Sequence, residues 1–171
     1  MNDLELFRIQ AQYNKWMNDH FYLLCDAIAD EERKRDAGAF FKSIHGTLNH
    51  ILLGDRLWMS RFQNTIFEIE SLDQELYSDY EELKKQRVFT DRNINDYVDG
   101  LTDDVINQPI SFVSKVKKIQ HTFILRDCLL HFFHHQTHHR GQLSTLISQL
   151  GIDIGVTDMM WMPGIEKTGN L

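Results

Sequence analysis

The sequence predicts an all-α protein, an antiparallel four-helix bundle, and two observations support this fold class. Residues that interrupt helices are rare, since the 171-residue chain has two prolines and contains neither Pro nor Gly in residues 1–37, 55–99 and 110–140. A β-rich domain would need turns about every 8–12 residues. In the uninterrupted stretches, apolar residues recur at steps of three and four, which is the period of a helix with one buried face.

The first half of the chain predicts two long helices. The first covers about residues 4–28, and its apolar face contains Leu6, Ile9, Tyr13, Trp16, Met17, Phe21, Leu24 and Ile28. Residues 30–38 are mostly charged and end in Gly38, which predicts a loop with one short turn. The second helix covers about residues 41–62 and carries apolar side chains on more than one side, as expected for a helix flanked by partners.

A third helix is expected after a connection formed by residues 63–77. Ser78 and Glu81 have the spacing of a capping box, in which each side chain accepts a hydrogen bond from the other residue's backbone. The helix is therefore expected over about residues 78–98, and Gly100 is a suitable terminator.

The last part of the chain combines a short hairpin with a fourth helix. Residues 109–121 alternate imperfectly between apolar and polar, which favours a small β-hairpin with a turn at Ser114-Lys115. Thr122 is the expected N-cap of a helix over about residues 122–150, followed by an irregular tail, residues 151–171. We expect a single domain, residues 1–171, with the helices running up and down or joined by crossover connections.

Composition excludes several classes of function. Eighteen Lys and Arg residues against 25 Asp and Glu residues give a net charge of −7, so the chain lacks the basic surface of a general nucleic-acid binder. No apolar run approaches the length of a membrane span, and the first residues do not resemble a secretory signal. Cys25 and Cys128 are far apart and fit reduced thiols of a cytoplasmic protein.

The histidines are the strongest functional signal. Of nine in the chain, five fall in one short stretch: His131, His134, His135, His138 and His139. Within this stretch, two pairs have the i, i+4 spacing that places two imidazoles on one face of a helix. Because the two pairs occupy different faces, only one of them can point into the bundle.

Flanking residues indicate which pair points inward. The helical line through His135 and His139 continues into apolar residues at both ends, namely Leu125, Cys128, Phe132, Leu143, Leu146 and Leu150. The line through His134 and His138 is more polar, since it continues into Asp127, Leu130, Gly141, Thr145, Ser148 and Gln149. We therefore expect His135 and His139 to face the interior, and His134 and His138 to face solvent or a partner. His131 precedes His135 by one turn and is either a packing residue or part of the same cavity.

Two inward imidazoles predict a metal site. Buried polar groups without partners are costly, and neutral imidazole is a good ligand for zinc, nickel, copper and iron. A third ligand must come from another helix. His50, in the middle of the second helix, is the best candidate, and His20 in the first helix is the reserve. His45 is five residues from His50 and lies on a different face.

The same residues resemble a known family. The second helix contains His50 within Ser43-Ile44-His45-Gly46-Thr47-Leu48-Asn49-His50, and the fourth contains the pattern HxxxHRGQ from His135 to Gln142. Together they resemble the DinB-like family of metal-binding four-helix proteins. The resemblance implies an antiparallel bundle with an unusual connection order and a divalent metal on His50, His135 and His139. Members of this family are often homodimers, so the resemblance also implies a homodimer. Zinc or nickel is the expected ion, with iron as a further candidate.

Three histidine ligands leave an open coordination position, at which a metal lowers the pKa of water or a thiol. In some branches of the DinB-like family, the metal activates a low-molecular-weight thiol such as bacillithiol or mycothiol. We therefore expect a metal-dependent enzyme, a thiol transferase or hydrolase that acts on a small molecule. The alternative is a non-catalytic metal-binding or stress-response protein.

The sequence does not identify catalytic residues. No HExxH pattern occurs, and Gln136 occupies the position at which that motif has its glutamate. Asp55 is among the candidate carboxylates, but no spacing relates it to the histidines. Arg140 is expected either to bind an anionic group or to form an ion pair on the helix surface.

Overall fold

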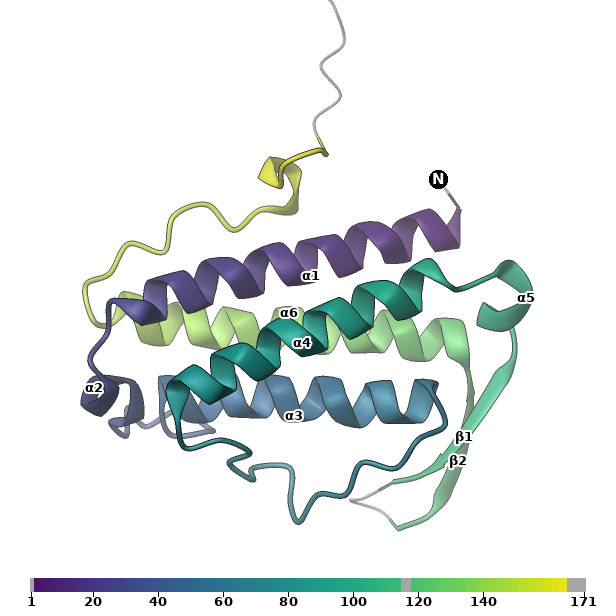
Figure 1. Cartoon of the computed structure of the whole chain (residues 1–171), viewed down its shortest axis with the longest axis horizontal. Coiled ribbons are helices and arrows are strands. Elements are labelled where there is room, and N and C mark those ends of the chain that lie inside the picture. Colours follow the sequence, from purple (N-terminus) through teal and green to yellow (C-terminus); the bar gives the residue numbers. More distant parts are fainter. Residues whose placement is uncertain (1, 115–117, 166–171) are drawn as a thin grey trace, which may run out of the picture.

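The computed structural model describes residues 2–114 and 118–165, and its four long helices form the predicted bundle (Figure 1). The helices are α1 (Asp3–Asp26), α3 (Ile44–Phe62), α4 (Tyr80–Asp99) and α6 (Leu125–Ser148). α1 packs against α4 and α6, and α3 packs against the same two helices. The all-α fold class is therefore confirmed. No helix among the described residues is long and apolar enough to cross a membrane.

The connection order differs from a simple up-and-down bundle. α3 and α4 both run toward the end of the bundle where the hairpin lies, and α1 and α6 run in the opposite direction (Figure 1). The chain between α3 and α4, residues 63–79, therefore crosses the whole length of the bundle. We call residues 63–79 the crossover segment. Because of this crossover, the antiparallel neighbours are α1 with α4 and α3 with α6.

Short elements complete the fold. They are α2 (Asp30–Lys34), α5 (Asp103–Ile106), strands β1 (Pro109–Val113) and β2 (Gln120–Ile124), and the 3-10 helix η1 (Met159–Trp161). The strands form the predicted antiparallel hairpin, with Pro109 opposite Ile124. Lys115 of the predicted turn and the last residues of the predicted tail lie outside the described residues. α5 was not predicted from the sequence.

Three predicted helix starts are wrong, for local reasons. α3 begins at Ile44 and not near residue 41, because the hydroxyl of Ser43 caps it by accepting a hydrogen bond of 3.0 Å from the backbone of Gly46. Asp79, and not Ser78, caps α4: its carboxylate accepts a hydrogen bond of 2.7 Å from the backbone of Glu82. α6 begins at Leu125 and not at Thr122, because Thr122 belongs to β2, where its hydroxyl lies 2.7 Å from that of Ser111. Cross-strand pairing there competes with helix formation and prevails.

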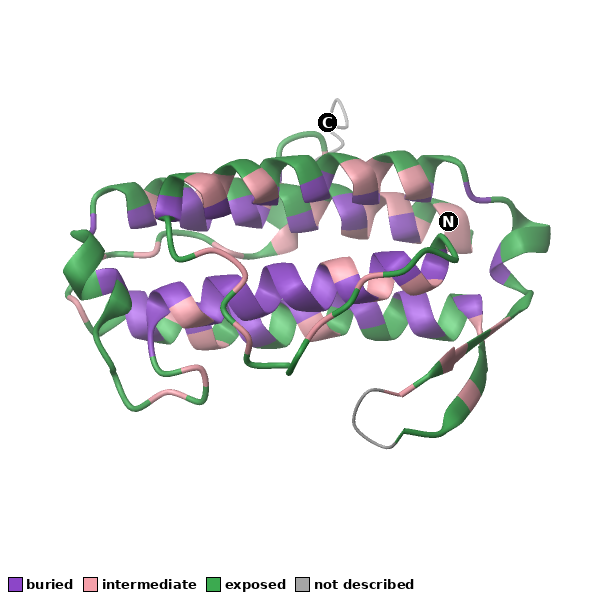
Figure 2. Cartoon of the chain, turned by 60° about the horizontal axis from the view of Figure 1, so that its bottom comes forward, coloured by how far each residue is buried: buried purple, intermediate pink, exposed green. Residues whose placement is uncertain are grey.

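The apolar core consists of two clusters, one at each end of the bundle, and Figure 2 shows that the buried residues face inward. The cluster at the α2 end includes Phe21, Leu52, Leu83 and Ile147. The cluster at the hairpin end includes Phe7, Ile94, Leu129 and Phe132. Burial of this apolar surface is the main force that holds the helices together.

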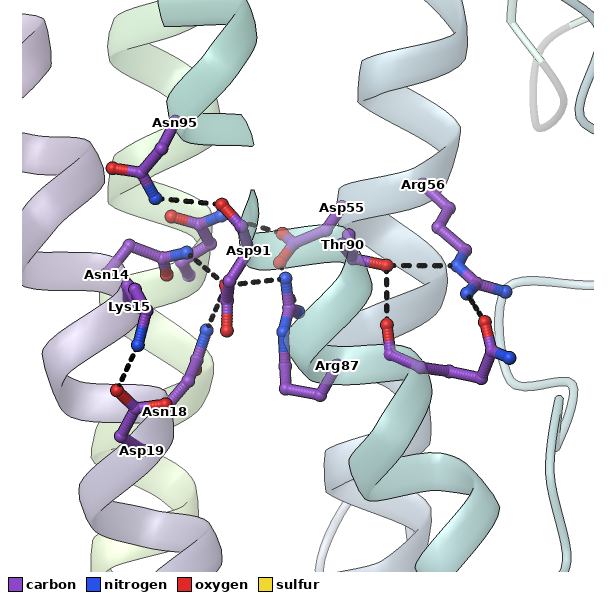
Figure 3. Close-up of polar contacts among 12 residues, drawn as sticks. Asn14, Lys15, Asn18, Asp19, Asp55, Arg56, Arg87, Thr90, Asp91 and Asn95 are labelled. Atoms are coloured by element: carbon purple, nitrogen blue, oxygen red, sulfur yellow. Dashed lines mark hydrogen bonds and ion pairs between the residues drawn. The ribbon is translucent and has the colours of Figure 1, made fainter. Parts of the chain in front are cut away.

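A buried polar layer lies between the two clusters and connects all four long helices (Figure 3). At its centre, Arg87 of α4 donates to Asp55 of α3 at 2.6 Å and lies 2.8 Å from Asp91. Asn14 and Asn18 of α1 both donate to Asp91, at 3.1 and 2.9 Å. The two carboxylates raise the pKa of Arg87 above its ordinary value, although burial opposes them, so the guanidinium stays charged.

The polar layer predicts an unequal cost for two similar substitutions. Arg87→Met leaves Asp55 and Asp91 buried without their cation, and the free energy of unfolding is expected to fall by about 3–5 kcal/mol. Lys84→Met removes the half-exposed pair with Asp26 and is expected to cost less than about 1 kcal/mol. Urea unfolding measures both values. Equal costs would contradict a structural role for the buried layer.

Candidate metal centre

The structure brings His50, His135 and His139 together between α3 and α6. His139 Nε2 lies 3.1 Å from Nε2 of His50 and 3.1 Å from Nε2 of His135. One nitrogen from each of the three lies within 4.8 Å of the others. Imidazole nitrogens that bind zinc tetrahedrally at about 2.0–2.1 Å are about 3.3 Å apart. Nε2 of His139 therefore lies near ligand spacing from both other nitrogens, and all three nitrogens are close enough to hold a single ion.

Helix geometry explains this convergence. His135 and His139 are one turn apart on the inner face of α6, and antiparallel α3 places His50 beside His139. One turn after His50, Gly54 lies against the His135 ring: a Cβ atom at position 54 would be 2.9 Å from Cε1 of His135. The missing side chain of Gly54 therefore makes room for the third imidazole.

Hydrogen bonds fix the tautomers of two of the rings. Nδ1 of His50 donates to the backbone carbonyl of Leu72 at 2.8 Å, and Nδ1 of His139 donates to the amide oxygen of Gln142 at 2.8 Å. With the proton on Nδ1, each Nε2 presents a lone pair, and these two lone pairs face one another. No hydrogen bond joins two acceptors, whereas a cation between them satisfies both, so the donor set fits a metal.

The crossover segment delivers the Leu72 carbonyl. It is held to α3 by Asn49, the neighbour of His50 in sequence, whose side-chain oxygen accepts from the backbone amides of Leu76 and Tyr77, both at 2.9 Å. The amide nitrogen of Asn49 donates to the Tyr77 carbonyl at 3.1 Å. One residue of α3 therefore anchors the segment that orients the ring of the next residue.

An apolar wall covers the histidine group on one side. The ring of Phe41 stacks on His50 with a centroid distance of 3.7 Å and meets His139 edge-on at 5.5 Å. Burial lowers the pKa of His50 to about 4 and that of His135 to about 3, and it also lowers the pKa of His139. All three imidazoles are therefore neutral at pH 7, the state that binds a metal.

The remaining histidines lie as predicted or have other partners. His134 and His138 are exposed, as the flanking residues predict. His20, the reserve ligand, lies 2.7 Å from the Ile154 carbonyl and belongs to the contact between α1 and the tail. His45 lies 2.9 Å from the Tyr77 carbonyl. His131 packs against Trp58, with ring centroids 5.1 Å apart, and is a neighbour of His135 and not part of the group.

Sequence reasoning missed the surroundings of Gln136 and Arg140. Gln136 donates to Asp55 at 2.8 Å, and buried Arg140 donates to the side chain of Asn14. The expectation of a surface ion pair or an anion site at Arg140 is wrong, because the polar layer occupies its guanidinium. A signal was available: Gln136 and Arg140 repeat the i, i+4 spacing of the ligands one residue later, and so mark a second inward line.

Comparisons with known proteins agree with this geometry. The sequence profile of the DinB family matches residues 1–169. The chain is 24% identical over 163 residues to Protein DinB of Bacillus subtilis strain 168, with 91% of this chain and 94% of that protein covered. A crystal structure of a DinB-like protein from Bacillus cereus ATCC 10987 superposes with a TM-score of 0.60 at 17% identity, covering 82% of this chain and 90% of the other. This second similarity supports the fold.

The contact at Gly54 predicts a matched pair of variants. In Gly54→Ala, the new methyl group displaces the His135 ring, and the affinity for a divalent metal is expected to fall by about tenfold or more. In Gly141→Ala, no atom lies within 4 Å of the new methyl group, and the affinity is expected to stay unchanged. Competition with a chromophoric chelator measures both. Equal affinities in the two variants would show that Gly54 does not position the ring.

The pKa shifts predict how metal binding depends on pH. Because the neutral imidazole persists above a lowered pKa, protons compete with the metal only well below the pKa of about 6.5 of a free histidine. We expect bound metal to remain constant as the pH falls to about 5.5 and to decrease as it approaches about 4, where His50 titrates. Metal content after gel filtration at each pH, with circular dichroism to monitor folding, tests this. Release near pH 6.5 from folded protein would contradict it.

Proposed function

Since this chain belongs to the DinB family, we propose that it binds a divalent metal through His50, His135 and His139 and uses it to activate a thiol or water for reaction with a small molecule. One observation carries the proposal: the Nε2 lone pairs of His50 and His139 face each other at 3.1 Å, with His135 Nε2 beside them. Zinc or nickel, which the family resemblance favours, is the ion we propose, and iron is the next candidate; imidazole is a ligand for all three.

Each residue around the group has a role in this proposal. The three histidines hold the ion, and the Leu72 carbonyl and Gln142 keep the protons of His50 and His139 on Nδ1. Phe41 excludes water from one side. A bound ion with an open coordination position supplies Lewis-acid chemistry, which lowers the pKa of a thiol or water placed there.

Transfer from a low-molecular-weight thiol suits the site better than hydrolysis assisted by a general base. Among residues 2–114 and 118–165, no carboxylate joins the three histidines in the cluster. The buried carboxylate of Asp55 is engaged by Arg87 and Gln136. A thiol becomes a nucleophile once it loses its proton, and its reaction then needs no further base at the metal.

A non-catalytic role is the second candidate, and it is supported by the fact that the ligands come from two different helices. His50 belongs to α3 and the other two histidines to α6, so an ion bound here links two helices. Such an ion binds the folded protein and not the unfolded chain, and it therefore stabilises the folded state. In this reading the protein is a metal-binding or stress-response bundle. A homodimer in the cytoplasm is part of the proposal in both cases.

Substitution of single histidines tests the ligand set. His135→Ala and His139→Ala are expected to remove stoichiometric metal, because each deletes one of three ligands. His138→Ala, on the exposed face of the same helix, is expected to retain about one ion per chain. Elemental mass spectrometry of protein without a histidine tag measures the content. Loss of metal in His138→Ala with retention in His139→Ala would overturn the assignment.

A second experiment separates the two functions. The metal-loaded protein is incubated with bacillithiol or mycothiol and a panel of small electrophiles, and conjugates are quantified by mass spectrometry. Turnover that His139→Ala lacks supports the enzyme. A large loss of melting temperature on chelation, without turnover, supports the non-catalytic protein.

A further inference from the structure

A cavity of about 460 Å³ is lined by residues of α3, α6 and the hairpin strands β1 and β2. Its principal walls are Trp58, Arg61, Phe112, Phe123, Cys128 and His131. This volume lies in the range of about 300–1,000 Å³ that is typical of sites for small organic ligands. None of these residues belongs to the histidine group, so the cavity is a separate feature of the fold.

Among the described residues that line the cavity, Arg61 is the one with a fixed positive charge, and aromatic rings hold it in place. Its guanidinium carbon lies 4.5 Å from the ring centroid of Trp58 and 4.1 Å from that of Phe112. Within residues 2–114 and 118–165, no carboxylate forms an ion pair with Arg61; the nearby Asp127 is 65% exposed at the rim and lies 3.9 Å from Arg126. The half-buried guanidinium therefore keeps its charge and hydrogen-bond donors for a ligand.

Apart from the Asp127 carboxylate at the exposed rim, the described residues of the wall are apolar or neutral. Phe112 and Phe123 come from the hairpin, and their ring centroids are 5.9 Å apart. Burial raises the pKa of the Cys128 thiol to about 11, so it remains protonated and contributes a small apolar surface. A ligand that fits this cavity must therefore carry a negative charge to pair with Arg61 and apolar surface to contact the aromatic rings.

The geometry points to a binding site for a small aromatic carboxylate, with its carboxylate on Arg61 and its ring against Trp58, Phe112 and Phe123. Guanidinium and carboxylate are both planar and pair through two parallel hydrogen bonds. The described walls offer one guanidinium, which balances one negative charge, whereas a phosphate dianion would need a further cation. This site is independent of the proposed metal function, because binding requires none of the three histidines.

The site and the histidine group nevertheless both lie along the contact between α3 and α6. Along α6, His131 is one turn, about 6 Å, before His135, and the two ring centroids are 6.0 Å apart. Along α3, Trp58 is one turn beyond Gly54, which contacts the His135 ring. The inner wall of the cavity is therefore in contact with one member of the histidine group.

Calorimetric titration with 1-naphthoate tests the proposal, with the neutral 1-naphthamide as the matched probe. The untagged protein is used as purified and again after its metal has been removed with a chelator. We expect 1-naphthoate to bind both forms and to bind more tightly than 1-naphthamide. Arg61→Gln is expected to weaken 1-naphthoate binding by about tenfold or more and to leave 1-naphthamide binding unchanged.

Two further variants make the result specific. Arg92→Gln makes the same change of charge at an exposed position of α4 and is expected to bind 1-naphthoate like the parent protein. Phe123→Ala, at the exposed rim, is expected to weaken binding of both probes several-fold. The proposal is overturned if 1-naphthoate does not bind, if Arg61→Gln binds it like the parent, or if binding disappears with the metal, which would place the carboxylate on the ion.

Discussion

The buried charge of Arg87 is the constraint on which the arrangement of the helices depends. Apolar packing alone tolerates small shifts of one helix along another, but the buried pair of Arg87 on α4 and Asp55 on α3 does not, because a shift of one turn, about 5.4 Å, would leave the Asp55 carboxylate buried without its cation. A shift of α1 would likewise remove Asn14 and Asn18 from Asp91, which pairs with Arg87 within α4. The layer includes side chains from α1, α3, α4 and α6. It therefore fixes the axial register of the whole bundle.

The candidate metal centre follows from that register. Gln136 donates to Asp55 from the position directly after His135, and Gly54 directly precedes Asp55. The hydrogen bond between Gln136 and Asp55 therefore lies directly beside the contact between His135 and Gly54, one residue further along both helices. Register also sets His50 beside His139. The polar layer and the histidine group are two neighbouring rows of a single interface between α3 and α6.

The fold class and the histidine group could be predicted because both depend on periodicity. The apolar neighbours of His135 and His139 identify the inward face, and the absence of Pro and Gly identifies the helices. The surroundings of the group depend on contacts distant in sequence. The spacing of Gln136 and Arg140 marks an inward line, but neither the Leu72 carbonyl on His50 nor Asn14 as the partner of Arg140 leaves a mark in local sequence, since each requires knowing which segments are neighbours. The start of α6 was misplaced for the same reason, since the strand partner of Thr122 precedes it by 11 residues.

The crossover segment has a consequence for engineering of the chain. Surface connections are normally the safest places to insert residues or to open a backbone for circular permutation. In this protein the segment docks on Asn49 and supplies the acceptor for the His50 ring. New termini placed between Phe62 and Tyr80 would leave the helix packing intact but free this ring to rotate. Permutants or fusions that preserve the site should instead be opened after α2, at the exposed Arg35 and Asp36, and not at Arg33, whose buried guanidinium donates to the carbonyls of Cys25 and Ile28.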